Sequence, residues 1–261
     1  MICTTHTIDI PAGQLYAQHW HIDSPQAPII LLHDSLGSVA LWRDFPEKLA
    51  QTTQRSVIAY DRLGFGQSSP HPDQLQPDFV LTEATNAFAA VLDYFQLQQF
   101  VVFGHSVGGG MAVGCAAAYP ERCEGLIIES AQAFNETQTL DGIRLAQKSF
   151  QEPAQWQRLE KYHADQTAWV LSAWIDTWLS DAFADWHLDA TAQQVQAPSL
   201  ILHGEYDEYG SLAHPQRFAQ HIQHSQVKIL AGCHHVPHRE QTAEVLQHIQ
   251  AFCHNLQAVQ G

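Results

Sequence analysis

Residues 99–118 read QFVVFGHSVGGGMAVGCAAA. An apolar run, 99–103, leads through a G-x-S-x-G turn (Gly104–Gly108) directly into a Gly- and Ala-rich segment, 107–118, that favours a helix. This order of strand, turn and helix is the setting in which a serine hydroxyl is held above a sheet as a nucleophile. The sharp turn strains the serine backbone, so its flanking residues must be small. The stretch predicts Ser106 as a nucleophile, with an N–H donor at the start of the next helix.

Outward from this stretch, strands alternate with helices. Short apolar runs predict strands at 7–10, 14–20, 28–33, 55–61, 125–129, 199–203 and 226–230. Apolar residues at helical spacing predict helices near 41–50, 82–96 and 240–252. The alternation predicts an α/β fold, with a mostly parallel central sheet flanked by helices on both faces.

One segment breaks the alternation. Residues 131–194 contain no buried-strand pattern, and five of the seven tryptophans lie there among helix-like stretches. We therefore expect a core made of residues 1–130 and 195–261, with 131–194 inserted as a helical cap. Trp174 and Trp178 are one helical turn apart and are candidates for lining an apolar substrate pocket, although packing of the cap explains such residues equally well.

A serine nucleophile needs an imidazole to take its proton. The segment after the last predicted strand, GCHHVPHRE (232–240), offers His234, His235 and His238. These three histidines could in principle also bind a metal ion, but no acidic or thiolate partner at matching spacing supports that interpretation. We expect neither a metal nor an organic cofactor.

The imidazole in turn needs a carboxylate to orient it. The strand at 199–203 is followed by GEYDEY (204–209), where Asp207 is the first choice and Glu205 and Glu208 are alternatives. Two backbone N–H groups must bind the oxyanion. The expected donors are Val107, which follows the nucleophile, and Ser35, in the loop after the strand at 28–33.

Five segments, in order, resemble the α/β-hydrolase superfamily. They are HDSLGS (33–38), YDRLGFGQS (60–68), GHSVGG (104–109), HGEYD (203–207) and GCHHVPHRE (232–240). The chain is most similar to its cap-bearing bacterial members, which include enol-lactonases, carboxylesterases and carbon–carbon bond hydrolases. The resemblance implies the α/β-hydrolase fold and a triad of Ser106, Asp207 and His235. It places the catalytic imidazole on His235 by the register of the last segment.

Two residues depart from the family pattern. Asp34 stands where a glycine is usual, so its carboxylate either lies near the oxyanion hole or turns away to cap the next helix. His234 replaces a frequent glycine before the expected catalytic histidine. We expect the polar loop around Asp61 and Arg62 to be structural and to join strand ends by hydrogen bonds.

The expected activity is hydrolysis of an ester, lactone or thioester of a small apolar compound. An alternative is a carbon–carbon bond hydrolase of a vinylogous diketone acid, which needs a cation in its pocket. Arg144, Lys148, Arg158 and Lys161 lie in the insertion, although a solvated position is the simpler expectation for each. A ligand receptor that has kept the fold without the chemistry is the remote alternative.

Composition argues against two classes of partner, and the partner expected from the motifs is a small-molecule substrate. The net charge of −15 argues against nucleic acids and anionic membranes. Residues 1–20 show no signal-peptide pattern, and no apolar stretch approaches the roughly 20 residues that span a bilayer. The five cysteines are widely spaced and odd in number, which predicts reduced thiols and a cytoplasmic location. The oligomeric state is left open.

Overall fold

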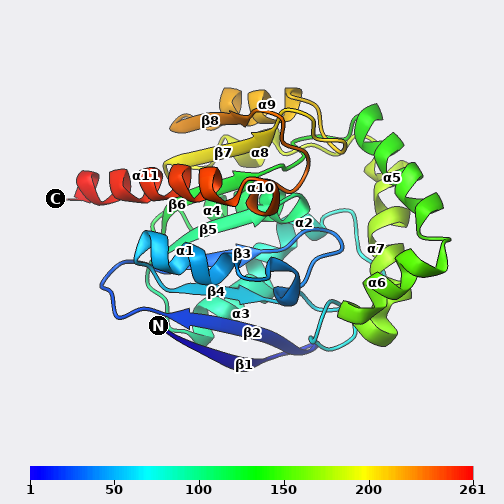
Figure 1. Ribbon diagram of the computed structural model, residues 1–261, viewed down its shortest axis with the longest axis horizontal. Helices are drawn as coiled ribbons and strands as arrows, with labels where there is room; N and C mark the ends of the chain where they lie inside the picture. Colours follow the sequence, from blue (N-terminus) through cyan, green and yellow to red (C-terminus); the bar gives the residue numbers. More distant parts are fainter. Residues whose placement is uncertain (261) are drawn as a thin grey trace.

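A single twisted sheet forms the centre of the computed structural model, which describes residues 1–260 (Figure 1). Its strands are β1 (Ile2–Ile10), β2 (Gly13–His21), β3 (Ile29–Leu32), β4 (Val57–Tyr60), β5 (Phe100–His105), β6 (Cys123–Glu129), β7 (Ser199–Gly204) and β8 (Ser225–Leu230). They lie in the order β1-β2-β4-β3-β5-β6-β7-β8. The β1–β2 and β2–β4 pairs are antiparallel, and every other neighbouring pair is parallel.

Helices cover both faces of this sheet and extend beyond one end of it. The α-helices are α1 (Phe45–Thr53), α2 (Phe79–Thr82), α3 (Ala87–Tyr94), α4 (Val107–Ala118), α5 (Thr137–Ser149), α6 (Pro153–His163), α7 (Thr167–Trp178), α8 (Asp189–Ala192), α9 (Ala213–His221), α10 (Pro237–Glu240) and α11 (Thr242–Gln260). Short 3-10 turns lie at η1 (Val39–Trp42), η2 (Glu83–Thr85), η3 (Ala164–Gln166) and η4 (Asp181–Phe183). The predicted α/β class with a mostly parallel sheet is confirmed.

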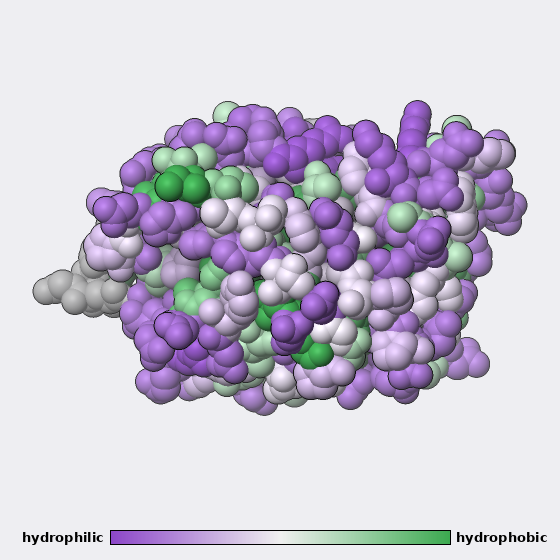
Figure 2. Space-filling view, turned by 90° about the horizontal axis from the view of Figure 1, so that it is seen from below, coloured by the Kyte–Doolittle hydropathy of each residue, from purple (hydrophilic) through white to green (hydrophobic). Residues whose placement is uncertain are grey.

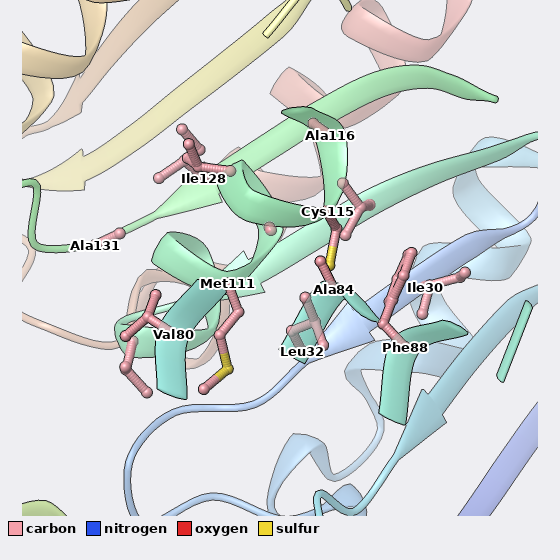
Figure 3. Packing of buried hydrophobic residues seen from close by; sticks show 14 of the residues in the cluster. Ile30, Leu32, Val80, Ala84, Phe88, Met111, Cys115, Ala116, Ile128 and Ala131 are labelled. Atoms are coloured by element: carbon pink, nitrogen blue, oxygen red, sulfur yellow. The ribbon is translucent and has the colours of Figure 1, made fainter. Parts of the chain in front are cut away.

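The sheet separates two hydrophobic cores. On one face, α1 and α11 pack on the sheet through residues such as Leu49 and Ile249. On the other, α3 and α4 pack through residues such as Phe88 and Met111 (Figure 3). Because α4 carries mainly glycine and alanine, its backbone lies close to the strands, and this holds its first turn at the sheet edge where β5 ends.

Two predicted helices need correction, and one helix of the structure was not predicted. The helix expected at 41–50 is instead η1 and α1, separated by Arg43 in a left-handed conformation (φ 55°). The helix expected at 82–96 is interrupted at Asn86, where the Tyr119 hydroxyl donates to the carbonyl of Ala84, the acceptor that a continuous helix would use. Helix α9 had no predicted counterpart.

Between β6 and β7 the chain forms α5 to α8, which include the three long helices α5, α6 and α7 beyond one end of the sheet (Figure 1). The pairing found there among the described residues is an isolated bridge between Phe134 and His187.

The face in Figure 2 is mainly hydrophilic, with small separate apolar patches. Within residues 1–260, no helix has both the length and the apolar composition that crossing a membrane requires.

Candidate active site

Ser106 lies on a strained turn between β5 and α4. Its backbone has φ 55° and ψ −127°, a conformation that non-glycine residues rarely adopt. The flanking glycines are sterically required. A Cβ on Gly104 would lie 1.9 Å from the Gly108 carbonyl oxygen, and one on Gly108 would lie 2.2 Å from that of Leu32. The predicted elbow is thus present, and the packing around it explains why the strained conformation persists.

Three side chains from distant segments form a continuous hydrogen-bonded row. His235 Nε2 lies 3.1 Å from Ser106 Oγ. On the other side of the ring, His235 Nδ1 lies 2.8 and 2.9 Å from the two carboxylate oxygens of Asp207. Asp207 follows β7 and His235 follows β8, so the carboxyl ends of parallel strands bring both to the same edge of the sheet as Ser106.

The alternative histidines lie elsewhere. The His234 ring is exposed, with Nδ1 3.7 Å from Glu208. His238 is buried, and its Nδ1 lies 2.5 Å from a carboxylate oxygen of Glu129. The alternative acid Glu205 accepts the Gly232 N–H and does not contact His235.

Asp207 is held as a carboxylate. Burial alone would raise the pKa of Asp207, but the rings of His235 and His203 and the backbone N–H of Tyr209 outweigh it and lower this pKa below its ordinary value. The Tyr209 N–H donates to Asp207 Oδ1 at 2.8 Å. The Tyr209 ring also packs edge to face against the His235 ring, with 4.8 Å between the ring centroids. Sequence reasoning missed Tyr209, although it stands only two residues after the chosen acid.

The loop after β3 lies beside this row. Asp34 Oδ1 accepts the N–H of Leu36 at 2.8 Å, and the Asp34 carbonyl accepts that of Gly37. Ser35, which lies between Asp34 and Leu36 in the chain, lines the same cavity as Ser106. Val107 is the first residue of α4, where N–H groups have no intrahelical acceptor. Of the two expected oxyanion donors, Ser35 thus lines the same cavity as Ser106, and Val107 follows Ser106 in the chain.

Asp34 neither caps the next helix nor turns fully away. Its Oδ2 lies 3.4 Å from His105 Nδ1, while His105 Nε2 lies 2.8 Å from the carbonyl oxygen of His235. Burial would lower the pKa of His105, but Asp34 and Glu129 outweigh it, and the pKa is raised above its ordinary value. The His105 ring thus lies between the carboxylate of Asp34 and the backbone carbonyl of His235.

The three histidines weighed as metal ligands are not the group that the fold assembles. Among the described residues, His105, Glu129 and His238 have ligand atoms within 4.8 Å of one another. All three are buried directly behind Ser106, and the 2.5 Å contact between His238 and Glu129 already pairs two of them. Within the cluster, His238 and Glu129 are hydrogen-bonded to each other, whereas His105 Nδ1 and Glu129 Oε1 have no hydrogen-bond partner among the described residues.

The loop around Asp61 is structural, as expected. Its carboxylate accepts the N–H of Val39 at 2.5 Å and that of Gln67 at 2.8 Å, which joins the loops after β3 and β4. Gly66 has φ 54°, and a Cβ there would collide with the Asp61 carboxylate. Burial raises the pKa of Asp61 to about 6.

A cavity of about 160 Å³ opens at Ser106. Both predicted pocket residues, Trp174 and Trp178, line it from α7. Sequence reasoning missed the other residues that reach it from β6 onward, which are Gln132, Thr139, Ile143, Tyr209 and Val236. No lysine or arginine of the described residues lines this cavity, so the four cations of the insertion lie outside it.

Comparison with known proteins agrees with this fold. The model of the alpha/beta hydrolase fold family matches residues 27–180, more than half of the chain. The serine hydrolase BPHL of Mus musculus is 26% identical over 239 residues, which cover 88% of this chain and 80% of that protein. The protein abhd-5.2 of Caenorhabditis elegans is 37% identical over 109 residues, 42% of this chain, but the match spans only 24% of that longer protein.

Among solved structures, the proline iminopeptidase of Mycobacterium smegmatis superposes with a TM-score of 0.74 over 99% of this chain and 100% of that one. At 21% identity this likeness shows the fold alone. The chain belongs to the α/β-hydrolase fold family. Its class is therefore that of a hydrolase, and the resemblance of its sequence motifs to this superfamily is confirmed.

Proposed function

We propose that this protein is a serine hydrolase that cleaves an ester, lactone or thioester through an acyl-enzyme. The observation that carries the proposal is the row Asp207–His235–Ser106, with contacts of 2.8 and 3.1 Å, which ends on a serine at a strained elbow. A nucleophile hydrogen-bonded to a base, which is itself oriented by a third group, is the geometric signature of nucleophilic catalysis.

The reaction proceeds in two halves. In the first, His235 Nε2 takes the proton of Ser106 as Oγ bonds to the carbonyl carbon, and the carbonyl oxygen becomes an oxyanion held by the N–H groups of Ser35 and Val107. The ring then gives that proton to the leaving oxygen or sulfur as its bond to carbon breaks. In the second half, His235 takes a proton from water as the water oxygen bonds to the acyl carbon, and it returns that proton to Ser106 Oγ as the bond from Oγ to the acyl carbon breaks and the acid leaves. Asp207 stabilises the imidazolium in both halves.

The cavity favours an uncharged acyl group. Its walls include the apolar side chains of Ile143, Trp174 and Trp178, and Asp34 also lines it. Burial alone would raise the pKa of Asp34, but the neighbouring His105 and the Leu36 N–H keep this pKa far below its ordinary value. A fixed negative charge with no lysine or arginine among the described lining residues opposes the acidic substrate of the carbon–carbon hydrolase alternative.

We further propose that residues 131–194 act as a cap on a core made of residues 1–130 and 195–261. Support comes from α7, which contributes Trp174 and Trp178 to the cavity, and from α5, which contributes Thr139 and Ile143. These side chains shield the reacting atoms from bulk water, and that shielding strengthens the electrostatic interactions around them.

The test is hydrolysis of p-nitrophenyl esters from acetate to octanoate by the wild type and Ser106→Ala. We expect kcat to fall by about 10³-fold or more in the variant, because the nucleophile is gone. Ser172→Ala is the matched control, since that hydroxyl bonds Asp176 on α7 and does not line the cavity. Turnover that survives in a folded Ser106→Ala protein would refute the assignment.

A fluorophosphonate probe separates a wrong nucleophile from a wrong substrate. It should add covalently to the wild type at Ser106, as located by peptide mass spectrometry, and leave Ser106→Ala unlabelled. Labelling without hydrolysis of any p-nitrophenyl ester would keep the nucleophile and reject these esters as substrates.

A further inference from the structure

The cavity at Ser106 is small for a substrate site. Its volume of about 160 Å³ lies below the roughly 300–1,000 Å³ of ordinary ligand pockets. A second cavity, of about 830 Å³, lies within that range. We call it the second chamber. It is bounded by the β1–β2 turn at residues 9–12, the irregular segment 71–76, and residues of α2, η2 and α3.

A third, small pocket, which we call the neck, is lined by residues of both cavities. On one side the neck shares Ser35, Trp174 and Trp178 with the cavity at Ser106. On the other it shares Arg62, Phe65, Leu75 and Phe79 with the second chamber. Val107 also lines the neck, so both proposed oxyanion donors, Ser35 and Val107, are among its lining residues.

Side chains close the neck in this conformation. Its volume of about 10 Å³ is at the lower limit for a single water molecule. Leu75 is half-buried on a segment that has neither helix nor strand, so its backbone can shift without breaking the hydrogen bonds of a regular element. The start of this segment is fixed to α7, because the Trp169 indole N–H donates to the Asp73 carbonyl at 3.0 Å.

The chamber is lined by apolar side chains, such as Phe65 and Phe79, together with polar and charged ones, and Arg62 lines both the chamber and the neck. Arg62 is buried, and its Nε has no hydrogen-bond partner among the described residues. Such a donor is costly unless an acceptor is supplied. Glu83 lies in the same wall and accepts the hydroxyl of Tyr60.

The charges around the chamber select against anions. Exposed carboxylates line it at Asp9, Asp73 and Asp78, in addition to Glu83, against the single guanidinium of Arg62. An anionic group entering the chamber would meet this excess of negative charge. An uncharged oxygen can accept from Arg62 without that penalty.

We propose that the second chamber receives the far end of a long, uncharged chain attached to the scissile ester, which reaches it through the neck and places a hydroxyl or ether oxygen near Arg62. This inference rests on the proposed function and extends its substrate class from short esters to long-chain ones. The chain is on either the acyl or the alcohol side of the ester, and two substrate series distinguish these cases.

The test fills the chamber from α3. Ala90 lines it, whereas the neighbouring half-buried Ala89 lines neither cavity nor the neck. The measured quantity is kcat/KM for the long ester divided by kcat/KM for the short ester. In Ala90→Trp we expect this ratio to fall by about tenfold or more, because one methylene group in an apolar pocket changes kcat/KM by about tenfold or more. Ala89→Trp should leave the ratio within about twofold. Leu75→Ala, which widens the neck, should raise it.

The acyl series runs from p-nitrophenyl acetate to dodecanoate, and the alcohol series from ethyl to dodecyl acetate. A fall of the ratio in either series supports the proposal and identifies the side that enters the chamber. If a folded Ala90→Trp protein, with the melting temperature of Ala89→Trp, keeps the wild-type ratio in both series, the proposal is wrong.

Binding separates this result from a failure of the proposed catalysis. Ser106→Ala should bind a pyrene-labelled dodecanol, and the double variant with Ala90→Trp should bind it about tenfold more weakly. If Ala90→Trp weakens binding of the labelled dodecanol, the result supports the second chamber as the binding site of the long chain, even if no ester is hydrolysed. Absence of binding to Ser106→Ala, or equal binding to both proteins, would overturn it.

Discussion

At the scale of single residues, the site depends on which groups are already occupied. The Asp207 carboxylate is hydrogen-bonded to the His235 ring and accepts the N–H of Tyr209. The nearby Glu208 is exposed and lies 3.7 Å from His234. Two carboxylates one residue apart therefore differ in burial, in partners and in what their removal would do.

Asp207→Asn should lower kcat by about 10³- to 10⁴-fold with little effect on KM for p-nitrophenyl acetate, because an amide neither fixes the ring tautomer nor stabilises the imidazolium. Glu208→Gln is the matched control and should stay within about twofold of the wild type. Comparable losses in both variants would mean that the acid has been assigned to the wrong position.

At the scale of elements, the contact between α4 and the sheet limits which residues the helix can carry. A Cβ on Gly108 would lie 2.2 Å from the backbone oxygen of Leu32, which cannot move without shifting β3. A Cβ on Gly114, in the same helix, would meet the Leu81 side chain at an ordinary 3.4 Å. The first glycine is required by close approach, whereas the second is not.

Gly108→Ala should lower the free energy of unfolding by about 1–3 kcal/mol or more, because of overpacking, and should also reduce activity by moving the elbow. Gly114→Ala should raise it by up to about 1 kcal/mol, since alanine is the better helix former. Urea unfolding of both proteins measures the difference. A Gly108→Ala protein as stable as Gly114→Ala would contradict the close approach of α4 to β3.

At the scale of the whole molecule, buried histidines dominate the response to acid. Six histidines among the described residues have lowered pKa values, and burial is the largest cause for each. These are His19, His33, His163, His203, His214 and His238. The pKa is lowered to about 4 for His19 and His214. Below about pH 6.5 the unfolded chain binds protons that the folded chain excludes, so acid favours unfolding.

The free energy of unfolding should therefore fall by about 2 kcal/mol or more between pH 7 and pH 5, since each excluded proton contributes up to about 1.4 kcal/mol per pH unit. Three groups with raised pKa values, His105, Asp61 and Glu83, oppose this trend but are fewer. Urea unfolding in high salt is the measurement, because screening suppresses the general repulsion of a chain with net charge −15. A free energy of unfolding at pH 5 that equals or exceeds the value at pH 7 would contradict this prediction.

The sequence by itself determined the elements whose signal is local. The apolar run before Ser106 and the small residues after it specify a strand, a turn and a helix, and α4 has the predicted bounds, Val107–Ala118. The alternation of strands and helices likewise specified a mostly parallel sheet, because burial on both faces leaves a continuous apolar pattern. Family motifs narrowed the candidate triad to Ser106, Asp207 and His235, whose roles stay proposals until the variants are measured.

Tertiary structure decided whatever depends on contacts between distant segments. The register of the family motif favoured His235 over His234 and His238, but the contact of its ring with Ser106, 129 residues away in the chain, exists only in the folded protein. The break at Asn86, the position of Tyr209 and the second chamber arise in the same way, from side chains that meet across the fold. Local sequence cannot encode these, because hydrogen bonds and cavities between elements exist only after the elements have packed.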